Sequence, residues 1–339
     1  MEHILEGEEY FLNALNTASE TLEFLRTDFA TLQSAAFLDG RSEVSIDNKI
    51  YTVSLADAMS WYETRGAARS MSRLIFHISF CGSTLLSRAL DTSDSVLVYK
   101  EPQVLTSLEE MIRHSDFDGA CGYSWKQILG LVLSQFNSAD PTSCVHVVKP
   151  SNLINSIVRD ICELNDQNKA VFLDMEPRSF LIAVLRGGSA RISFIFRVLE
   201  NLQSTYPGYG QTVSRLLSGK EDEMAVVARK ILLAHAMQSK IFADVMTSLP
   251  EHRYVQLSYE QLVASPQRHI SRIACSLDVG LSPDQVGRNV DSSFGRHSKA
   301  DGLPFNLRSA AEVDAQVIDL YSHIVEDAVD WYWQQDFFT

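Results

Sequence analysis

Five short apolar runs divide the middle of the chain into regular units. They lie at residues 74–78, 96–99, 145–148, 170–173 and 254–257. Polar or proline-containing segments bound each run, and longer stretches with helical spacing lie between most of them. Continuous apolar runs are typical of strands that are buried on both faces. The pattern therefore predicts an α/β fold with three layers, in which helices cover both faces of a central parallel sheet.

The segments outside these runs have other patterns. Residues 1–39 carry apolar side chains near helical spacing, and residues 44–53 alternate across Asp47-Asn48-Lys49, which predicts a small hairpin. The helically spaced positions are Leu12, Leu15, Leu22, Leu25 and Leu32. We therefore expect residues 1–70 to form a helical extension with a small hairpin, residues 71–300 to form the main α/β domain, and residues 301–339 to form a helical tail.

Residues 190–248 are predicted to be mostly helical, with an interruption around Tyr206-Pro207-Gly208-Tyr209-Gly210. A helical insertion of this size could form a lid over a substrate. The aromatic residues near the end of the chain, Trp331-Tyr332-Trp333 and Phe337-Phe338, are expected to cap a hydrophobic face of the chain or of a partner. If these residues cap a face of a partner, that partner could be a second copy of the chain, so a homo-oligomer stays open.

Composition narrows the classes of function. The 339 residues are 45% hydrophobic and 21% charged, which indicates a packed core. No apolar run is long enough for a membrane helix, and the acidic start lacks the pattern of a secretory signal, so we expect a cytoplasmic protein without a membrane partner. A net charge of -14 disfavours nucleic acid as a partner. Five widely spaced cysteines predict reduced thiols, and the histidines form no ligand pair, so we expect no metal.

Polar residues gather where the predicted strands end. In open parallel sheets, ligands bind at the carboxyl ends of the strands. The sets found there are Gly82-Ser83-Thr84, Lys100-Glu101-Pro102, Lys149-Pro150, Asp174 with Glu176, and Tyr259-Glu260. We therefore expect the functional site at this edge of the sheet.

The segment after the first strand has the composition of an anion-binding loop. Cys81-Gly82-Ser83-Thr84-Leu85 joins the strand to a helix, whose first N–H groups and dipole favour an anion. Gly82 permits close approach of the backbone, and Ser83 and Thr84 add hydroxyl donors. The first glycine and the lysine of a nucleotide P-loop are absent, which disfavours a standard ATP or GTP loop. An ordinary strand–helix junction is the structural alternative.

Three segments carry a resemblance to a known family. Residues 76–90, FHISFCGSTLLSRAL, resemble the 5'-phosphosulfate loop of sulfotransferases that use 3'-phosphoadenosine 5'-phosphosulfate (PAPS). Residues 254–266, YVQLSYEQLVASP, are similar to a later strand of that family, and Arg296-His297-Ser298-Lys299 resembles its late basic segment. The resemblance covers about residues 73–300 and points to a divergent, bacterial-type member. It implies a P-loop-like sulfotransferase fold with PAPS as donor and adenosine 3',5'-bisphosphate as product.

The chain departs from the family pattern at three positions. Phe80 stands where the loop usually has a basic residue, and Met175 and Ala183 stand where an arginine and a serine usually bind the 3'-phosphate of the nucleotide. The basic residues that could bind the donor instead are Arg178, Arg186, Arg296 and Lys299. The structural alternative for each is solvated surface charge.

Two residues are candidates for the chemistry. Glu101 ends a predicted strand, and a carboxylate near this place acts as general base in many members of the family, so we assign it that role or, alternatively, that of a surface carboxylate. Lys149 ends a central strand and is expected to bind the donor. Lys100 and Glu101 should point to opposite faces of their strand. His77 is expected to be a core histidine, and Cys81 either a reactive thiol or a small residue that fits.

These residues support one leading hypothesis and two alternatives. The leading one is transfer of a sulfuryl group from PAPS to a hydroxyl or amine of a small molecule or peptide. The first alternative is a magnesium-dependent nucleotide phosphotransferase, in which Asp174 would hold Mg²⁺ and Glu176 would act as base. The second alternative is a non-catalytic binding protein on a degenerate sulfotransferase fold.

Overall fold

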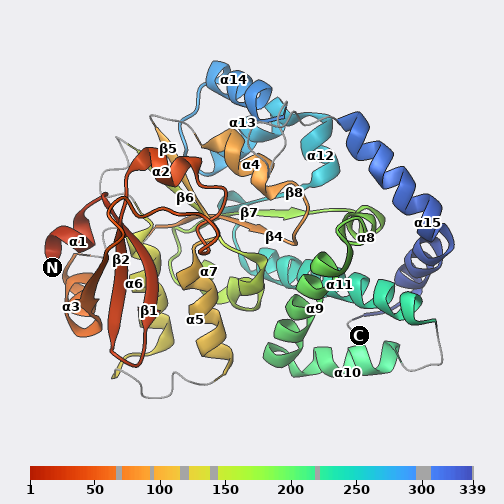
Figure 1. Cartoon of the computed structure of the whole chain (residues 1–339), viewed down its shortest axis with the longest axis horizontal. Helices are drawn as coiled ribbons and strands as arrows, with labels where there is room; N and C mark the ends of the chain where they lie inside the picture. Colours follow the sequence, from red (N-terminus) through yellow and green to blue (C-terminus); the bar gives the residue numbers. More distant parts are fainter. Residues whose placement is uncertain are drawn as a thin grey trace.

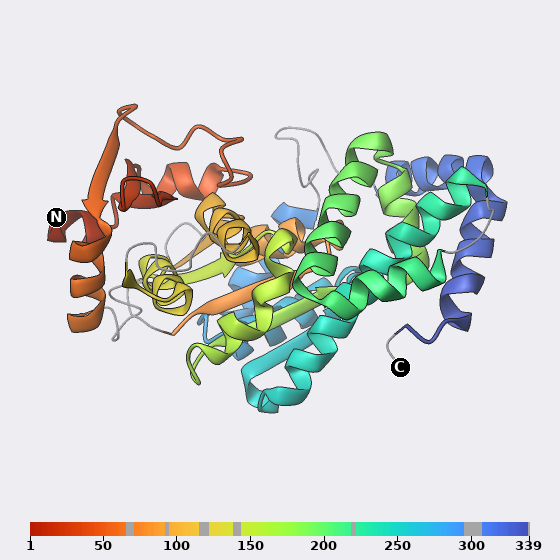
Figure 2. The same cartoon turned by 90° about the horizontal axis from the view of Figure 1, so that it is seen from below.

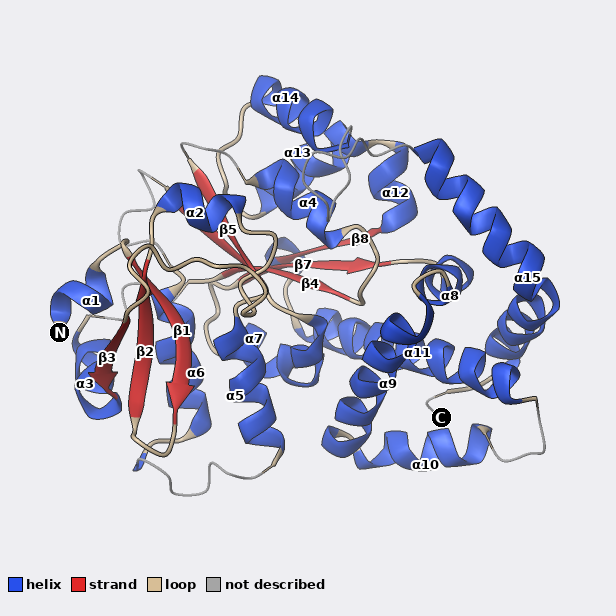
Figure 3. Cartoon of the chain, in the orientation of Figure 1, coloured by secondary structure: helices blue, strands red, loops and turns tan. Residues whose placement is uncertain are grey.

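The computed structural model describes residues 1–65, 71–91, 95–114, 122–137, 144–217, 222–294 and 307–337. Its centre is a five-stranded parallel sheet with the strand order β5-β6-β4-β7-β8. The strands are β4 (Arg73–His77), β5 (Val96–Lys100), β6 (Val145–Lys149), β7 (Lys169–Asp174) and β8 (Tyr254–Ser258). Each predicted strand is present within one or two residues of its expected bounds. The α/β fold class with a central parallel sheet is therefore confirmed (Figures 1 and 3).

Helices cover the sheet on both faces, as Figure 1 shows. One face is covered by α4 (Ser83–Leu90), α13 (Pro266–Ser276) and α14 (Pro283–Phe294), with α12 (Tyr259–Ala264) directly after β8. The opposite side carries α5 (Gln103–Arg113), α6 (Trp125–Gln135), η3 (Asn152–Ile157), α7 (Val158–Glu163), α11 (Glu223–Ser248) and the short turn η4 (Glu251–Arg253). Every residue of β5 and β6 is buried, whereas in the edge strand β8 Val255 and Leu257 are buried and Gln256 is exposed. Burial on two faces explains why the central strands have continuous apolar sequences.

The prediction of a helical extension over residues 1–39 is wrong. This segment contains β1 (Tyr10–Asn16) and β2 (Thr21–Arg26), flanked by the short helices α1 (Glu2–Glu6) and α2 (Phe29–Ser34). A bulge between Leu12 and Ala14 shifts the register of β1 against β2. The extra residue brings Leu12 and Leu15, three positions apart, to buried positions in the same strand. A spacing of three that suggested a helix thus belongs to a bulged strand.

The prediction of a small hairpin over residues 44–53 is also wrong. Only residues 50–54 form a strand, β3 (Ile50–Ser54), which pairs antiparallel with β2 and is followed by α3 (Leu55–Thr64). Asp47 accepts hydrogen bonds from the N–H of Lys49 and the hydroxyl of Tyr51, so its side chain stabilises a turn before the strand. The extension is therefore a three-stranded antiparallel sheet, and Figure 2 shows this N-terminal segment, in red and orange, at one end of the molecule.

The insertion predicted over residues 190–248 is helical. It consists of α9 (Gly188–Thr205), α10 (Pro207–Leu216) and α11, and it follows α8 (Pro177–Leu185). The predicted interruption lies at Tyr206, after which Pro207 begins α10 at a position where its missing N–H has no cost. Helix α11 is part of the core, because it buries Leu232, Met237 and Phe242. A lid function for α9 and α10 stays a prediction. Within the described ranges, no helix is long and apolar enough to cross a membrane.

The C-terminal helix α15 (Leu307–Gln334) packs against α8 and α11 and bends at Tyr321. The buried His235 of α11 connects it to the sheet. Its Nε2 lies 2.7 Å from the carbonyl oxygen of Met175, after β7, and its Nδ1 lies 3.1 Å from the hydroxyl of Tyr332. A neutral ring satisfies both contacts, because Nε2–H donates to the carbonyl and Nδ1 accepts from the hydroxyl. Burial lowers the pKa of His235 to about 4.

This pKa predicts a pH dependence of stability. The folded state binds the His235 proton less readily than the unfolded chain, so stability is lost as the pH falls from about 6.5 to about 4. We expect the free energy of unfolding of the wild type to fall by about 3 kcal/mol more than that of His235→Gln over this range. Urea unfolding at several pH values measures the difference. His252→Gln, at an exposed position, should behave as the wild type. Parallel curves for the wild type and His235→Gln would contradict the account.

Candidate active site

The loop between β4 and α4 has an unusual backbone. Its φ angle is positive at Ser79 (80°), Phe80 (54°) and Gly82 (79°). For residues with a side chain, this conformation costs about 1–2 kcal/mol, so neighbouring groups must hold it. The buried His77 does so in part: its Nδ1 accepts the N–H of Ser79 at 3.2 Å, and its Nε2 donates to the carbonyl of Pro150 at 3.1 Å. The expected core histidine is confirmed, and it supports the loop.

A buried amide cluster holds the end of β4 from the side of α11. Asn155 donates to the carbonyl of His77 at 3.0 Å, and Gln238 donates to the carbonyl of Ile78 at 3.4 Å. The Oε1 atom of Gln238 accepts hydrogen bonds from Asn152 and Asn155 at 3.0 and 2.9 Å. These bonds satisfy carbonyl groups where the strand ladder has ended. The position of the loop is therefore fixed by η3 and α11 together.

Gly82 allows the loop to pass under an aromatic ring. A Cβ atom at this position would lie 2.9 Å from the ring of Tyr259, the first residue of α12. Helix α4 begins directly afterwards and has no side-chain cap at its N-terminus. Ser83 and Thr84 are 5% and 7% exposed, and no hydrogen bond to another described residue engages their hydroxyls. The first N–H groups of α4 and two hydroxyls thus share one small region, which suits a sulfate or phosphate group.

The thiol of Cys81 points away from this region. It is fully buried and lies 3.5 Å from the carbonyl oxygen of Leu173, to which it donates. Burial also raises the pKa of the Cys81 thiol to about 12, which disfavours the thiolate near neutral pH. The burial of the thiol therefore favours the alternative of a small residue that fits over that of a reactive thiol. A contact from Cys81 or from the nearly buried Leu85 to a ligand stays a prediction, and it would have to come from the backbone.

Glu101 and Lys149 form an ion pair at adjacent strand ends. The Nζ atom of Lys149 lies 2.6 Å from Oε1 of Glu101, and the two side chains are 1% and 14% exposed. Glu101 has a φ of 59°, and its N–H donates to the carbonyl of Lys149 at 2.7 Å. Lys100 points the other way and pairs with Asp91 at 2.5 Å. The prediction that Lys100 and Glu101 occupy opposite faces is therefore confirmed.

The N-terminal extension adds an arginine to this pair. Nη2 of Arg41 lies 3.5 Å from Oε2 of Glu101, and its guanidinium stacks 3.8 Å from the ring centre of Phe37. The Lys149 ammonium lies 5.6 Å from the same ring. Segment 35–41 is fixed there because the N–H of Leu38 donates to the carbonyl of Lys100. Sequence reasoning missed Arg41, since nothing in its local pattern indicates that the extension returns to the end of β5.

A second arginine missed in the sequence lies at the loop. The guanidinium of Arg191, from α9, stacks 4.6 Å from the ring centre of Phe80 and donates to the carbonyl of Ala183 at 2.5 Å. Burial lowers the pKa of Arg191, with a further contribution from the charge of Arg186. The loop has no basic residue of its own, so Arg191 brings positive charge next to it from a distant part of the chain. The sequence of the predicted insertion does not distinguish Arg191 from the other basic residues there, so it did not indicate that this side chain faces the loop.

The other basic residues predicted to bind the donor have different surroundings. Arg186 pairs with Asp314 and Arg178 with Glu326, each at 2.7 Å, so both connect α8 to α15. Burial raises the pKa of Tyr259, which lies over Gly82. The charge of Arg186 opposes this rise in part, so Arg186 lies in the same neighbourhood. The roles of these arginines in binding stay predictions. Arg296 and Lys299 lie outside the described residues.

Acidic residues at the end of β7 bear on the magnesium alternative. Asp174 is partly buried and accepts a hydrogen bond from Gln256 at 3.2 Å. Burial raises the pKa of Asp174, and the nearby charges of Glu260 and Glu176 act in the same direction. Across the part of the chain that the structure describes, no three His, Cys, Asp or Glu side chains are arranged to hold a metal ion.

Comparisons with known proteins give structural likenesses only. No family model and no curated protein matches the chain. The sulfotransferase domain from the curacin biosynthetic pathway is similar to it at 14% identity and a TM-score of 0.41, over 79% of this chain and 99% of that one. Retinol dehydratase in complex with androsterone and the inactive cofactor PAP is similar at 15% identity and a TM-score of 0.31. Its complex with retinol and PAP is similar at 15% identity and a TM-score of 0.30. Each comparison covers 97% of this chain and 98% of that one. Similarities this distant assign no residue of the site.

The packing of Gly82 gives the first test of the loop. Gly82→Ala would meet both a left-handed backbone and the ring of Tyr259, whereas Gly280→Ala, at a φ of 73°, would meet no atom within 4 Å. We expect Gly280→Ala to lower the free energy of unfolding by about 1–2 kcal/mol, and Gly82→Ala to cost at least about 1 kcal/mol more. Urea denaturation of both variants measures this. Equal costs would show that the ring of Tyr259 does not restrict the loop.

The ion pair at the strand ends gives a second test. Glu101→Gln removes the partner of a Lys149 ammonium that is almost completely buried. We expect a loss of about 3 kcal/mol in the free energy of unfolding, because breaking a buried pair leaves a charge uncompensated. The double variant Glu101→Gln with Lys149→Met should recover most of this loss. A double variant less stable than Glu101→Gln alone would contradict the assignment of the pair.

Proposed function

We propose that the chain transfers a sulfuryl group from PAPS to a hydroxyl or amine of a small molecule or peptide. One juxtaposition carries the proposal: an anion-binding loop at the end of β4 lies beside the Glu101–Lys149 pair at the ends of β5 and β6. The loop suits an anionic group, and the pair offers a proton acceptor next to a cation. The sequence resemblance of residues 76–90 and 254–266 to sulfotransferases supports the same donor.

The proposed step uses these groups in defined ways. The acceptor oxygen or nitrogen attacks the sulfur of PAPS, the bond between that sulfur and the 5'-phosphate oxygen breaks, and adenosine 3',5'-bisphosphate leaves. The proton of the acceptor goes to Glu101. We assign it to Oε2, because Oε1 is held by Lys149 at 2.6 Å while Oε2 has only the longer contact of 3.5 Å to Arg41 among the described residues.

Charge on the transferred group needs stabilisation during this step. The first N–H groups of α4, with the hydroxyls of Ser83 and Thr84, are the proposed ligands of the 5'-phosphosulfate. Lys149 and Arg191 are the proposed sources of positive charge near it. Met175 and Ala183 are buried and apolar and do not fit the 3'-phosphate. That group would instead bind Arg186, Arg296 or Lys299.

A ligand-binding experiment separates the three hypotheses. A ligand at a hundredfold excess over its Kd stabilises the folded state by about 2.7 kcal/mol, which is a rise of roughly 2–4 °C in Tm for a domain of this size. We expect adenosine 3',5'-bisphosphate to give this shift without metal. A shift with ATP that requires Mg²⁺, and none with the bisphosphate, would favour the phosphotransferase. No shift with either nucleotide would remove the support for both enzymatic hypotheses.

The loop residues are tested in the same assay. Ser83→Ala with Thr84→Ala removes two proposed donors and should weaken binding of the bisphosphate ~10-fold or more, since a hydrogen bond to a charged group contributes ~1.5–3 kcal/mol. Ser292→Ala, an exposed hydroxyl on α14, is the control and should leave the Kd unchanged. Unaltered affinity in the loop variant would move the donor site away from α4.

The role of Glu101 is tested by turnover once an acceptor is known. Glu101→Gln should lower turnover ~10²–10⁴-fold at unchanged donor affinity.

A further inference from the structure

The N-terminal sheet ends in an edge strand, β3, which has β2 as its one neighbouring strand among the described residues. The strand at the other edge, β1, also packs against α5 and α6, whereas β3 packs against β2 and α3. Figure 3 shows β3 as the outermost strand of this sheet. Because an edge strand presents N–H and C=O groups to one side, β3 is a candidate surface for pairing with another strand.

The bonds between β3 and β2 identify the groups that point outward. The N–H of Leu55 donates to the carbonyl of Glu20 at 2.8 Å, and the antiparallel register places these two residues opposite each other. Bonded and non-bonded pairs alternate along two antiparallel strands. Three residues of β3 therefore turn their backbone groups away from β2: Ile50, Thr52 and Ser54. No hydrogen bond to another described residue engages their N–H groups.

The sequence of β3 favours pairing at this edge. Segment 50–54, IYTVS, consists of apolar, β-branched, aromatic and small polar residues that suit a strand, with neither a charge nor a proline. Its register with β2 is continuous, without a bulge. Ile50 is 61% exposed, so pairing would also remove apolar surface from water. Charged residues, prolines and bulges are the usual means of protecting an edge strand, and segment 50–54 has none of them.

The charges that flank the strand are opposite in sign. Lys49 precedes it and Asp57 follows it in the first turn of α3; both are exposed, and neither forms an ion pair with another described residue, although Asp47 lies near enough to Lys49 to sense its charge. An antiparallel strand of the same sequence reverses these ends, so Lys49 of one copy would approach Asp57 of the other. A second copy of the chain is therefore complementary to this edge in charge as well as in hydrogen bonding.

We infer that two copies of the chain pair through β3, antiparallel and with Thr52 at the two-fold axis. In this register all of segment 50–54 is paired. The two Thr52 residues exchange both of their backbone hydrogen bonds, and each Ser54 N–H donates to the carbonyl of Ile50 in the other copy. Each edge then covers the other, and the same surface serves in both copies. The inference does not rest on sulfuryl transfer, because it uses no residue of the candidate site.

Sedimentation equilibrium of the full chain tests the pairing. In about 0.15 M salt, the net charge of -14 on each copy is screened beyond about 8 Å. We expect the wild type to dimerise as its concentration rises. Thr52→Pro removes the N–H at the two-fold axis and leaves the bonds between β3 and β2 in place. It should weaken the dimer ~10-fold or more, since each copy loses a hydrogen bond to the other.

A charge exchange at Thr52 tests the register, because a residue on a two-fold axis faces its own copy. Thr52→Lys and Thr52→Glu each place like charges opposite one another, so each alone should dimerise ~2–5-fold more weakly than the wild type. An equimolar mixture should dimerise more tightly than either variant alone. Gln267→Lys and Gln267→Glu, at an exposed position on α13, should dimerise as the wild type does, alone and mixed. The side chain of Thr52 is exposed, so circular dichroism should show folded variants.

Three results would overturn the inference. A wild type that stays monomeric at about 1 mM would show that the edges do not pair. A dimer of unchanged affinity in Thr52→Pro would place the contact on another surface. A mixture of the two charged variants that dimerises no more tightly than each of them alone would exclude the register with Thr52 at the axis.

Discussion

An ammonium group removed from water costs several kcal/mol unless a carboxylate meets it with good geometry, and Lys149 imposes this condition at the end of β6. Glu101 meets it by adopting a left-handed backbone at the end of β5, which directs its side chain toward β6. Segment 35–41 then closes over the pair and adds Arg41 and Phe37. The N-terminal sheet is therefore more than an appendage, since one of its connecting segments contacts the candidate site through Arg41, whose own main ion-pair partner is Asp39 of the same segment.

Continuous apolar sequence made the central sheet predictable. Runs such as residues 170–173 have no polar position that could face water, and Lys149 and Glu101 are conspicuous because they follow apolar runs within one or two positions. The N-terminal strands could not be read in this way, because the bulge in β1 replaces the spacing of two by a spacing of three. Arg41 and Arg191 escaped notice for a different reason. Each reaches the site through a contact with a residue 60 or more positions away in sequence, Arg41 with Glu101 and Arg191 with the ring of Phe80, and no local pattern encodes that approach.

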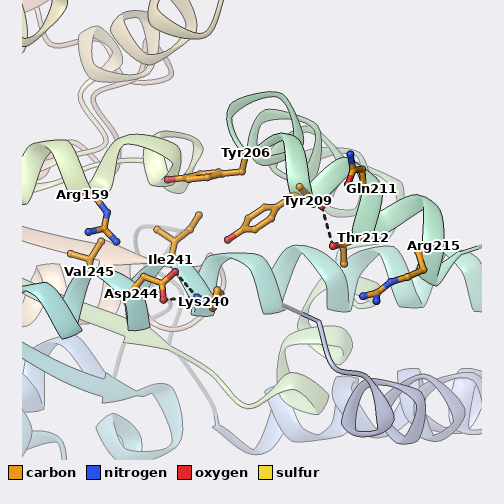
Figure 4. Close-up of a pocket in the computed structure, with 11 residues that line it drawn as sticks. Arg159, Tyr206, Tyr209, Gln211, Thr212, Arg215, Lys240, Ile241, Asp244 and Val245 are labelled. Carbon is orange, nitrogen blue, oxygen red and sulfur yellow. Dashed lines mark hydrogen bonds and ion pairs between the residues drawn. The ribbon is translucent and has the colours of Figure 1, made fainter. Parts of the chain in front are cut away.

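Helix α11 contributes to two regions, the loop after β4 and a cavity beside α10. Gln238 holds the carbonyl of Ile78 and, through Asn155, the carbonyl of His77, so it positions the start of the loop. One to two turns further, Ile241 and Asp244 line a cavity of about 640 Å³ between α7, α10 and α11 (Figure 4). The loop and the cavity therefore share one structural support, helix α11.

The contact between Arg186 and Asp314 has a consequence for the C-terminal helix. A guanidinium engaged with the carboxylate of Asp314 at 2.7 Å has fewer donors left for a phosphate. If Arg186 turns to a nucleotide, α15 loses one of the anchors that hold it to α8, while the bonds from Arg178 to Glu326 and from Tyr332 to His235 and the packing against α8 and α11 remain. Nucleotide binding through Arg186 and docking of α15 would then be reciprocally linked, so that undocking of α15 would favour nucleotide binding by the same factor by which bound nucleotide favours undocking.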